Sequence, residues 1–117
     1  MQERRARCAE AFRPLEHVEP MRIEVIGEDE SSNTQARTYA EYRVFAALAR
    51  HTQRVRSARV VLRRAEPGGT GDTVVCAVTV ALEPTGSVRT GAQGQHVYAA
   101  ITRAVERIGE LMRRRVA

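Results

Sequence analysis

The chain has 117 residues, 43% of them apolar and 4% aromatic, and a net charge of +5 in which all 19 basic residues are arginine. This length suits one domain whose core is built mainly from aliphatic side chains. The sequence contains no membrane-spanning apolar run, secretory signal, disulfide framework or zinc motif. We therefore expect a cytoplasmic protein without membrane or metal. Its basic charge favours a polyanionic partner such as nucleic acid or an anionic membrane, although a soluble protein can also be basic without such a partner.

The first 20 residues differ from the rest of the chain. Pro14 and Pro20 interrupt a short segment with helical character, and its apolar content is low. We predict that residues 1–20 form a flexible or loosely docked N-terminal extension. The folded domain is expected to occupy residues 21–117.

The domain opens with a strand and a helix. Residues 21–27 alternate between apolar and polar side chains and end in glycine, which predicts a strand. A helix is predicted over residues 34–51, with Ser32 and Gln35 forming a capping box at its start. Its arginines at positions 37, 43 and 50 are expected to be exposed. The predicted buried stripe consists of Ala36, Ala40, Val44, Ala47 and Leu48.

Three strands and a second helix follow. Alternation predicts strands at residues 57–66, 72–83 and 87–93, after a turn at residues 54–57. Glycine-containing hairpin turns are predicted at residues 67–71 and 84–86. The last strand contains glycine, as is typical of an edge strand or a bulge. A strongly amphipathic helix is predicted from Val97 to Arg115. Its predicted core residues are Val97, Ile101, Ala104, Val105, Ile108, Leu111 and Met112.

The order β-α-β-β-β-α predicts an α+β fold. Short loops make the last three strands an antiparallel meander, and the first strand is expected to pair with the second through the first helix. Both helices should then cover one face of a four-stranded sheet, as in a two-layer sandwich.

Enzyme motifs are missing from the sequence. The three histidines lack metal-ligand spacing, and no serine lies in a nucleophile elbow. Residues 91–94 resemble a phosphate-binding loop only loosely, because the lysine and full spacing are absent. We expect no catalytic residue, no metal and no cofactor, and no small-molecule substrate.

The positive charge is concentrated in one part of the chain. Residues 35–64 hold eight arginines and one acidic residue, a local charge of +7, whereas residues 1–34 sum to −3 and residues 65–117 to +1. Arginine suits phosphate because its planar fork donates two hydrogen bonds at once. A solvated helix face with pairs such as Glu110 and Arg114 is the alternative for the second helix. It does not account for the +7 block, which is expected to lack acidic partners.

Three stretches resemble the ribosome hibernation-promoting factor and ribosome-associated inhibitor family. They are the opening strand at residues 21–27, the segment from Leu48 to Leu62, and the string Gly94-Gln-His-Val-Tyr-Ala-Ala-Ile101 at the start of the second helix. The resemblance covers residues 21–115. It identifies the chain as a short form without a C-terminal dimerisation domain.

The resemblance implies a bacterial, cytoplasmic translation inhibitor for stress or stationary phase. Such a protein binds the small ribosomal subunit or whole ribosome near the decoding region and blocks the mRNA and tRNA sites. The oligomeric state is not implied. The rRNA-binding residues implied by position are Arg37, Arg43, Arg50, Arg54, Arg56, Arg63, Arg103, Arg107, Arg113 and Arg114.

Two other functions are compatible with the sequence. A general structured-RNA-binding domain, similar to a double-stranded-RNA reader, would bind free duplex RNA. A small-molecule-binding two-layer sandwich would require a pocket with convergent polar groups.

Overall fold

The computed structural model describes residues 21–29, 32–65 and 73–115, and its elements follow the predicted order β-α-β-β-β-α. The predicted extension at residues 1–20 and the predicted loop at residues 67–71 lie outside the described residues. The elements are β1 (Arg22–Gly27), α2 (Thr34–Leu48), the 3₁₀ turn η2 (Ala49–His51), β2 (Val55–Arg64), β3 (Val74–Leu82), β4 (Ser87–Gly94) and α3 (Val97–Arg115).

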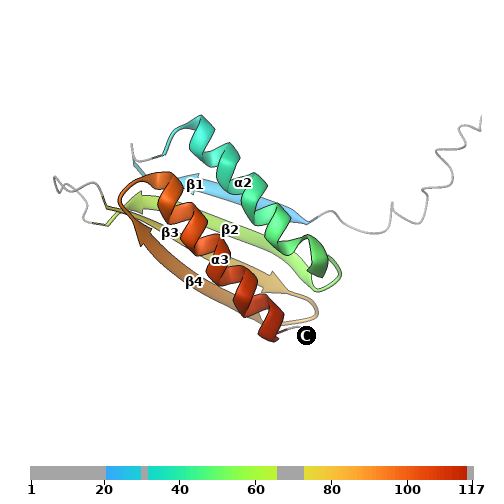
Figure 1. Ribbon diagram of the computed structural model, residues 1–117. Coiled ribbons are helices and arrows are strands. Elements are labelled where there is room, and N and C mark those ends of the chain that lie inside the picture. Colours follow the sequence, from blue (N-terminus) through green and yellow to red (C-terminus); the bar gives the residue numbers. More distant parts are fainter. Residues whose placement is uncertain (1–20, 30–31, 66–72, 116–117) are drawn as a thin grey trace, which may run out of the picture.

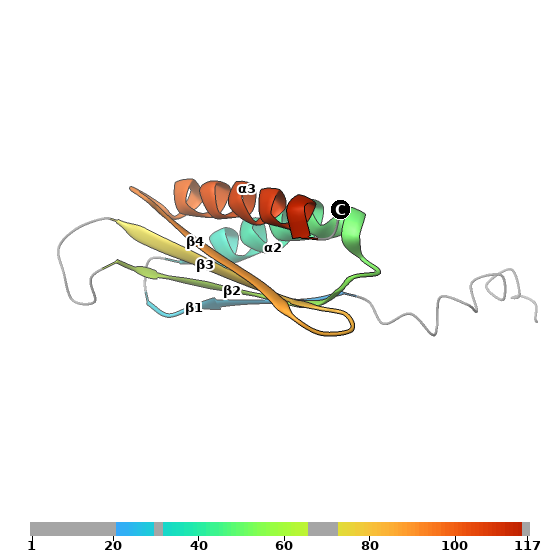
Figure 2. The same cartoon turned by 90° about the horizontal axis from the view of Figure 1, so that it is seen from below.

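The strands form one mixed sheet in the order β1-β2-β3-β4. β1 runs parallel to β2, with Val25 opposite Val60, whereas β2, β3 and β4 form an antiparallel meander. A parallel pair needs a crossover connection, and α2 supplies it. Both helices lie on the same face of the sheet, α2 over β1 and β2 and α3 over β3 and β4 (Figure 1, Figure 2). The predicted two-layer α+β arrangement is confirmed.

The hydrophobic core lies between the sheet and the helices. Along β3, alternate residues from Val74 to Leu82 are buried, as their alternation predicted. Ala47, Val97 and Leu111 were predicted as core but are only half-buried, because they lie at the margin of the helix–sheet contact. The buried helix residues are Ala36, Ala40, Val44 and Leu48 of α2 and Ala100, Ile101, Ala104, Val105, Ile108 and Met112 of α3.

The N-cap of α2 differs from the predicted one. Asn33, not Ser32, caps the helix, because its Oδ1 accepts a hydrogen bond from the backbone N–H of Ala36 at 2.8 Å. Ser32 is buried against β1, so close to Gly27 that a Cβ added there would collide with the Ser32 Oγ atom. The Ser32 Oγ atom is buried without a hydrogen-bond partner among the described residues, so it does not cap the helix.

Two further element boundaries also differ. The α-helix ends at Leu48 and continues as a single 3₁₀ turn to His51. β2 begins at Val55 instead of Ser57, because Val55 pairs with Leu82 on the far side of a register shift. β4 is an edge strand, as predicted, and its register with β3 is continuous, so the irregularity lies in β2.

A close contact joins β4 to α3. Gly94 is buried where the strand meets the first turn of α3, and a Cβ there would lie 2.5 Å from the backbone nitrogen of Ala100. His96 precedes the helix and caps its N-terminus, because its Nδ1 accepts a hydrogen bond from the Ala99 N–H at 3.2 Å. The glycine at this strand-to-helix turn is thus required by packing.

Candidate nucleic-acid interface

A groove of ≈ 490 Å³ separates the C-terminal halves of the two helices. Small residues line both sides of it, notably Ala46 and Ala47 on α2 and Gly109 on α3. The helices run in the same direction, so the end of α2 faces the end of α3 (Figure 1). The lining residues are Ala46, Ala47, Arg50, His51, Val105, Glu106, Gly109, Glu110 and Arg113.

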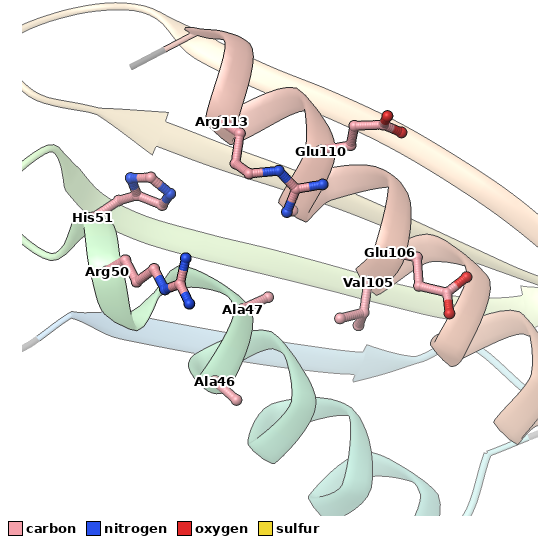
Figure 3. Close-up of a pocket in the computed structure, with 9 residues that line it drawn as sticks. Ala46, Ala47, Arg50, His51, Val105, Glu106, Glu110 and Arg113 are labelled. Carbon is pink, nitrogen blue, oxygen red and sulfur yellow. The ribbon is translucent and has the colours of Figure 1, made fainter. Parts of the chain in front are cut away.

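The charged side chains of this groove point in different directions. Arg50 from the α2 side and Arg113 from α3 extend toward the space between the helices, whereas the carboxylates of Glu106 and Glu110 point away from α2 (Figure 3). Glu110 also forms an ion pair with Arg114, one helical turn further on, with 3.5 Å between Oε2 and Nη2. The groove therefore presents two exposed guanidinium groups, one from each wall.

A third arginine continues this row along α2. Arg43 lies on α2 seven residues before Arg50, and it reaches the boundary with α3 through Tyr39, whose hydroxyl it binds. It is half-buried instead of exposed, because its guanidinium lies over the ring of Tyr39, 5.5 Å from the ring centroid. We define the seam arginines as Arg43, Arg50 and Arg113, which are the predicted site residues that the fold gathers along the α2–α3 boundary.

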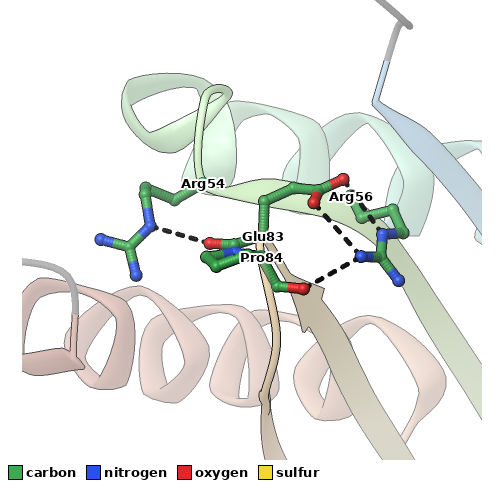
Figure 4. A network of polar contacts seen from close by, with 4 residues as sticks. All are labelled: Arg54, Arg56, Glu83 and Pro84. Carbon is green, nitrogen blue, oxygen red and sulfur yellow. Dashed lines mark hydrogen bonds and ion pairs between the residues drawn. The ribbon is translucent and has the colours of Figure 1, made fainter.

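Arg54 and Arg56 lie elsewhere, at the turn between β3 and β4 (Figure 4). Arg54 donates from Nε to the carbonyl of Glu83 at 3.1 Å, and Arg56 forms a two-pronged pair with the Glu83 carboxylate at 3.1 and 3.2 Å. Its Nη2 also donates to the Pro84 carbonyl at 3.3 Å. The hydrogen bonds and charge of Arg56 lower the pKa of Glu83, and Glu83 raises the pKa of Arg56 in return. Both arginines brace this turn.

Arg103 and Arg107 lie on the opposite side of α3 from the groove, over the edge strand β4. Arg103 donates to the carbonyl of Gln93 at 2.8 Å and Arg107 to that of Gly91 at 2.6 Å. Four helical residues rise about 6 Å and two strand residues about 6.8 Å, so the two spacings match. These arginines thus occupy outward carbonyls of β4 that would otherwise be open to strand pairing.

The remaining predicted residues are dispersed. Arg37 is half-buried near the start of α2, contrary to its expected exposure, and donates to the Thr34 hydroxyl at 3.4 Å. Arg63 is half-buried on β2 and donates to the carbonyl of Arg64 at 3.2 Å. Arg114 pairs with Glu110.

The +7 block has more acidic partners than its own sequence contains. Arg59 pairs with Glu24 of β1 at 3.2 Å, and Arg56 pairs with Glu83 of the β3–β4 turn. Both carboxylates come from outside residues 35–64 and reach the block only through strand pairing. The expectation that the whole block lacks acidic partners was therefore wrong.

A polar cluster at the α2–α3 boundary, centred on Tyr39, was not predicted. Tyr39 of α2 contacts Tyr98 and Thr102 of α3 and binds Arg43. The signal in the sequence was that Tyr39 lies outside the buried stripe predicted for this helix. It does not fit because it faces α3 and not the sheet.

The structure also bears on metal binding and on the crossing of a membrane. Within residues 21–29, 32–65 and 73–115, no group of three or more His, Cys, Asp or Glu residues is placed to hold a metal ion. The two helices in these ranges are too short or too polar to cross a membrane.

Comparisons with known proteins identify relatives. The family model described as Sigma 54 modulation protein / S30EA ribosomal protein matches residues 23–117. The N-terminal domain of Protein Y from Thermus thermophilus is similar in structure, with a TM-score of 0.66 and 29% identity, over 80% of this chain and 98% of that one. A ribosomal subunit interface protein from Coxiella burnetii has a TM-score of 0.65 over 80% of this chain and 96% of that one, but at 11% identity it shows the fold alone. No curated protein sequence matches the chain.

Proposed function

Because the chain belongs to the Sigma 54 modulation protein / S30EA ribosomal protein family, we propose that it is a hibernation factor that inhibits translation. The family consists of ribosome-associated factors and is not an enzyme family. In this proposal the protein binds the small ribosomal subunit near the decoding region and blocks the mRNA and tRNA sites. It acts in the cytoplasm on idle ribosomes, under stress or in stationary phase.

The observation that carries this proposal is the row of seam arginines. Arg50 and Arg113 extend toward one groove from opposite walls, and Arg43 continues the row along α2. Guanidinium groups at a groove can straddle a phosphate backbone, because each donates hydrogen bonds in a planar fork. Folded RNA is recognised mainly through its shape and its phosphates, which such a groove suits.

The other predicted arginines have secondary roles in the proposal. Arg103 and Arg107 each use one N–H group on β4, and a guanidinium has five, so both retain donors for phosphate. We propose that the residues outside the seam make peripheral contacts whose strength depends on how far their present partners release them. These residues are Arg37, Arg54, Arg56, Arg63, Arg103, Arg107 and Arg114.

The test is co-sedimentation of the protein with purified ribosomes and isolated subunits at increasing salt. We expect the wild-type protein to travel with the small subunit at low salt and to dissociate as salt rises. Arg50→Gln with Arg113→Gln should weaken binding and reduce the slope of log K against log salt by about 0.7–0.9 for each lost phosphate contact. Arg59→Gln with Arg89→Gln is the matched control. It removes the same charge from the face of the sheet that the helices do not cover.

Three outcomes contradict the proposal. Wild-type protein that stays at the top of the gradient at low salt would show that the chain does not bind ribosomes. Equal losses in the two double variants would indicate attraction by net charge alone and not by the groove. Efficient competition by short RNA duplexes would favour a general duplex-binding domain.

A further inference from the structure

Tyr39 occupies an unusual position at the boundary of the two helices. Its side chain is half-buried, and four contacts converge on it from both helices. The Arg43 Nη1 donates to the Tyr39 hydroxyl at 2.6 Å, and the Thr102 hydroxyl lies 3.2 Å from the same oxygen. The ring meets Tyr98 edge to face, with centroids 5.2 Å apart and planes at 69°. The guanidinium of Arg43 completes the set by lying over the ring.

The chemistry of these groups gives the contacts a direction. Arginine only donates hydrogen bonds, so the Tyr39 oxygen accepts from Arg43, whereas between the hydroxyls of Tyr39 and Thr102 either can be the donor. The hydrogen bond with Thr102 and the nearby charge of Arg43 together lower the pKa of Tyr39 from its ordinary value of 10.0, against a smaller opposing effect of burial. Tyr39 is therefore anchored on α3 through Thr102 and Tyr98, and it holds Arg43 through its hydroxyl and its ring.

Anchoring by Tyr39 lowers the entropic cost that Arg43 would bear on binding a phosphate. A free arginine side chain loses about 2 kcal/mol of rotamer entropy when it is fixed. Arg43 is already held by one hydrogen bond and one ring, whereas Arg50 and Arg113 are exposed at the groove. Only one of its five N–H donors is used by Tyr39, so the others are available to a phosphate without further ordering of the side chain.

We propose that Tyr39 is a positioning residue that pre-orders Arg43 for phosphate binding, through a hydroxyl and a ring that α3 fixes in place. This inference rests on the proposed function for the identity of the phosphate, which is that of rRNA. The inference goes beyond the proposed function in two ways. It names Tyr39 as a residue that acts through Arg43, and it makes Arg43 the pre-formed contact among the seam arginines.

The first experiment measures the order of Arg43 in the free protein. NMR relaxation of the arginine Nε–Hε groups should show Arg43 more ordered than Arg50, and Tyr39→Phe, which keeps the ring under Arg43, should lower the order of Arg43 toward that of Arg50. Tyr42→Phe is the matched control, because it removes a hydroxyl from the same helix at a side chain that is 68% exposed. An Arg43 side chain as mobile as Arg50 in the wild-type protein would overturn the proposal, whether or not the protein binds ribosomes.

The second experiment is a double-mutant cycle in ribosome binding. Tyr39→Phe keeps the ring and removes both hydrogen bonds of the hydroxyl, and the loss of the one that holds Arg43 corresponds to roughly three- to tenfold in affinity. The same substitution in an Arg43→Gln background should have no further effect, since the residue it positions is gone. Thermal melting of each variant checks that the fold is retained.

The outcomes separate the two proposals. An equal loss from Tyr39→Phe in both backgrounds would show that Tyr39 only locks the helices together and does not act through Arg43. Wild-type affinity in Tyr39→Phe would also refute the positioning role. If the wild-type protein fails to bind ribosomes but Arg43 is ordered by Tyr39, the proposed function falls and the positioning of Arg43 stands.

Discussion

Gly94→Ala tests the contact between β4 and α3, on which the position of the groove depends. A Cβ at this position would lie 2.5 Å from the Ala100 nitrogen, 2.8 Å from the Ala99 Cβ and 2.9 Å from the Ala99 carbonyl carbon. Favourable non-bonded contacts begin at about 3.5 Å, so the first turn of α3 has to move by roughly 1 Å. Two of these three atoms belong to the backbone and cannot rotate away.

The magnitude follows from two opposing effects. Overpacking a well-packed site typically costs about 1–3 kcal/mol, and the backbone contacts put Gly94→Ala near the upper end. Alanine offsets about 0.4–1 kcal/mol of this by restricting the unfolded chain. We expect a net loss of about 2 kcal/mol, which lowers the melting temperature of a domain of this size by roughly 10 °C.

Urea unfolding and thermal melting followed by circular dichroism measure this loss. Gly91→Ala is the matched control on the same strand, because the nearest atom to its Cβ would be the Cys76 carbonyl oxygen at 3.6 Å, an ordinary contact. We expect this variant to be as stable as wild type or slightly more stable. If Gly94→Ala is as stable as Gly91→Ala, the packing argument for Gly94 is wrong.

Two further predictions concern titratable groups. Burial raises the pKa of the Cys76 thiol to about 12, so in a Cys8→Ser variant thiol reagents should label Cys76 only after denaturation, and rapid labelling of the native protein would contradict this. Because the folded state favours the neutral thiol, its contribution to stability is present below the ordinary pKa of 9.0 and is lost as pH rises toward about 12. Arg56 lowers the pKa of Glu83 below its ordinary value of 4.5, so the contribution of Glu83 is present above that value and is lost as pH falls through the lower folded pKa. Urea unfolding of wild type and Glu83→Gln from pH 7 to pH 3 should show a difference in stability that shrinks on acidification, and a constant difference would exclude the ion pair as its cause.

The sequence alone predicted the buried residues correctly where the apolar side chains of an element lie on one face. The alternation along β3 and the helical period of α3 each separate one apolar face from one polar face, so the buried side of each element was predictable. The first helix was harder. Tyr42 and Phe45 are 68% and 50% exposed on its outer side, so apolar residues occur all around α2 and its stripe was only partly defined.

The element order, the sheet topology and the concentration of basic charge on one stretch were thus determined by the sequence itself, because short connections and side-chain periods act between near neighbours. Which side chains contact one another across the fold was decided only by the tertiary structure. Arg56 finds Glu83 through strand pairing, and Tyr39 finds Thr102 through the packing of two helices. These partners lie 27 and 63 residues apart in the chain, and no local pattern encodes a contact over such a separation. Of the ten arginines that the sequence proposes as site residues, the fold brings Arg43, Arg50 and Arg113 to the α2–α3 boundary, and a role of the ten in binding stays a prediction.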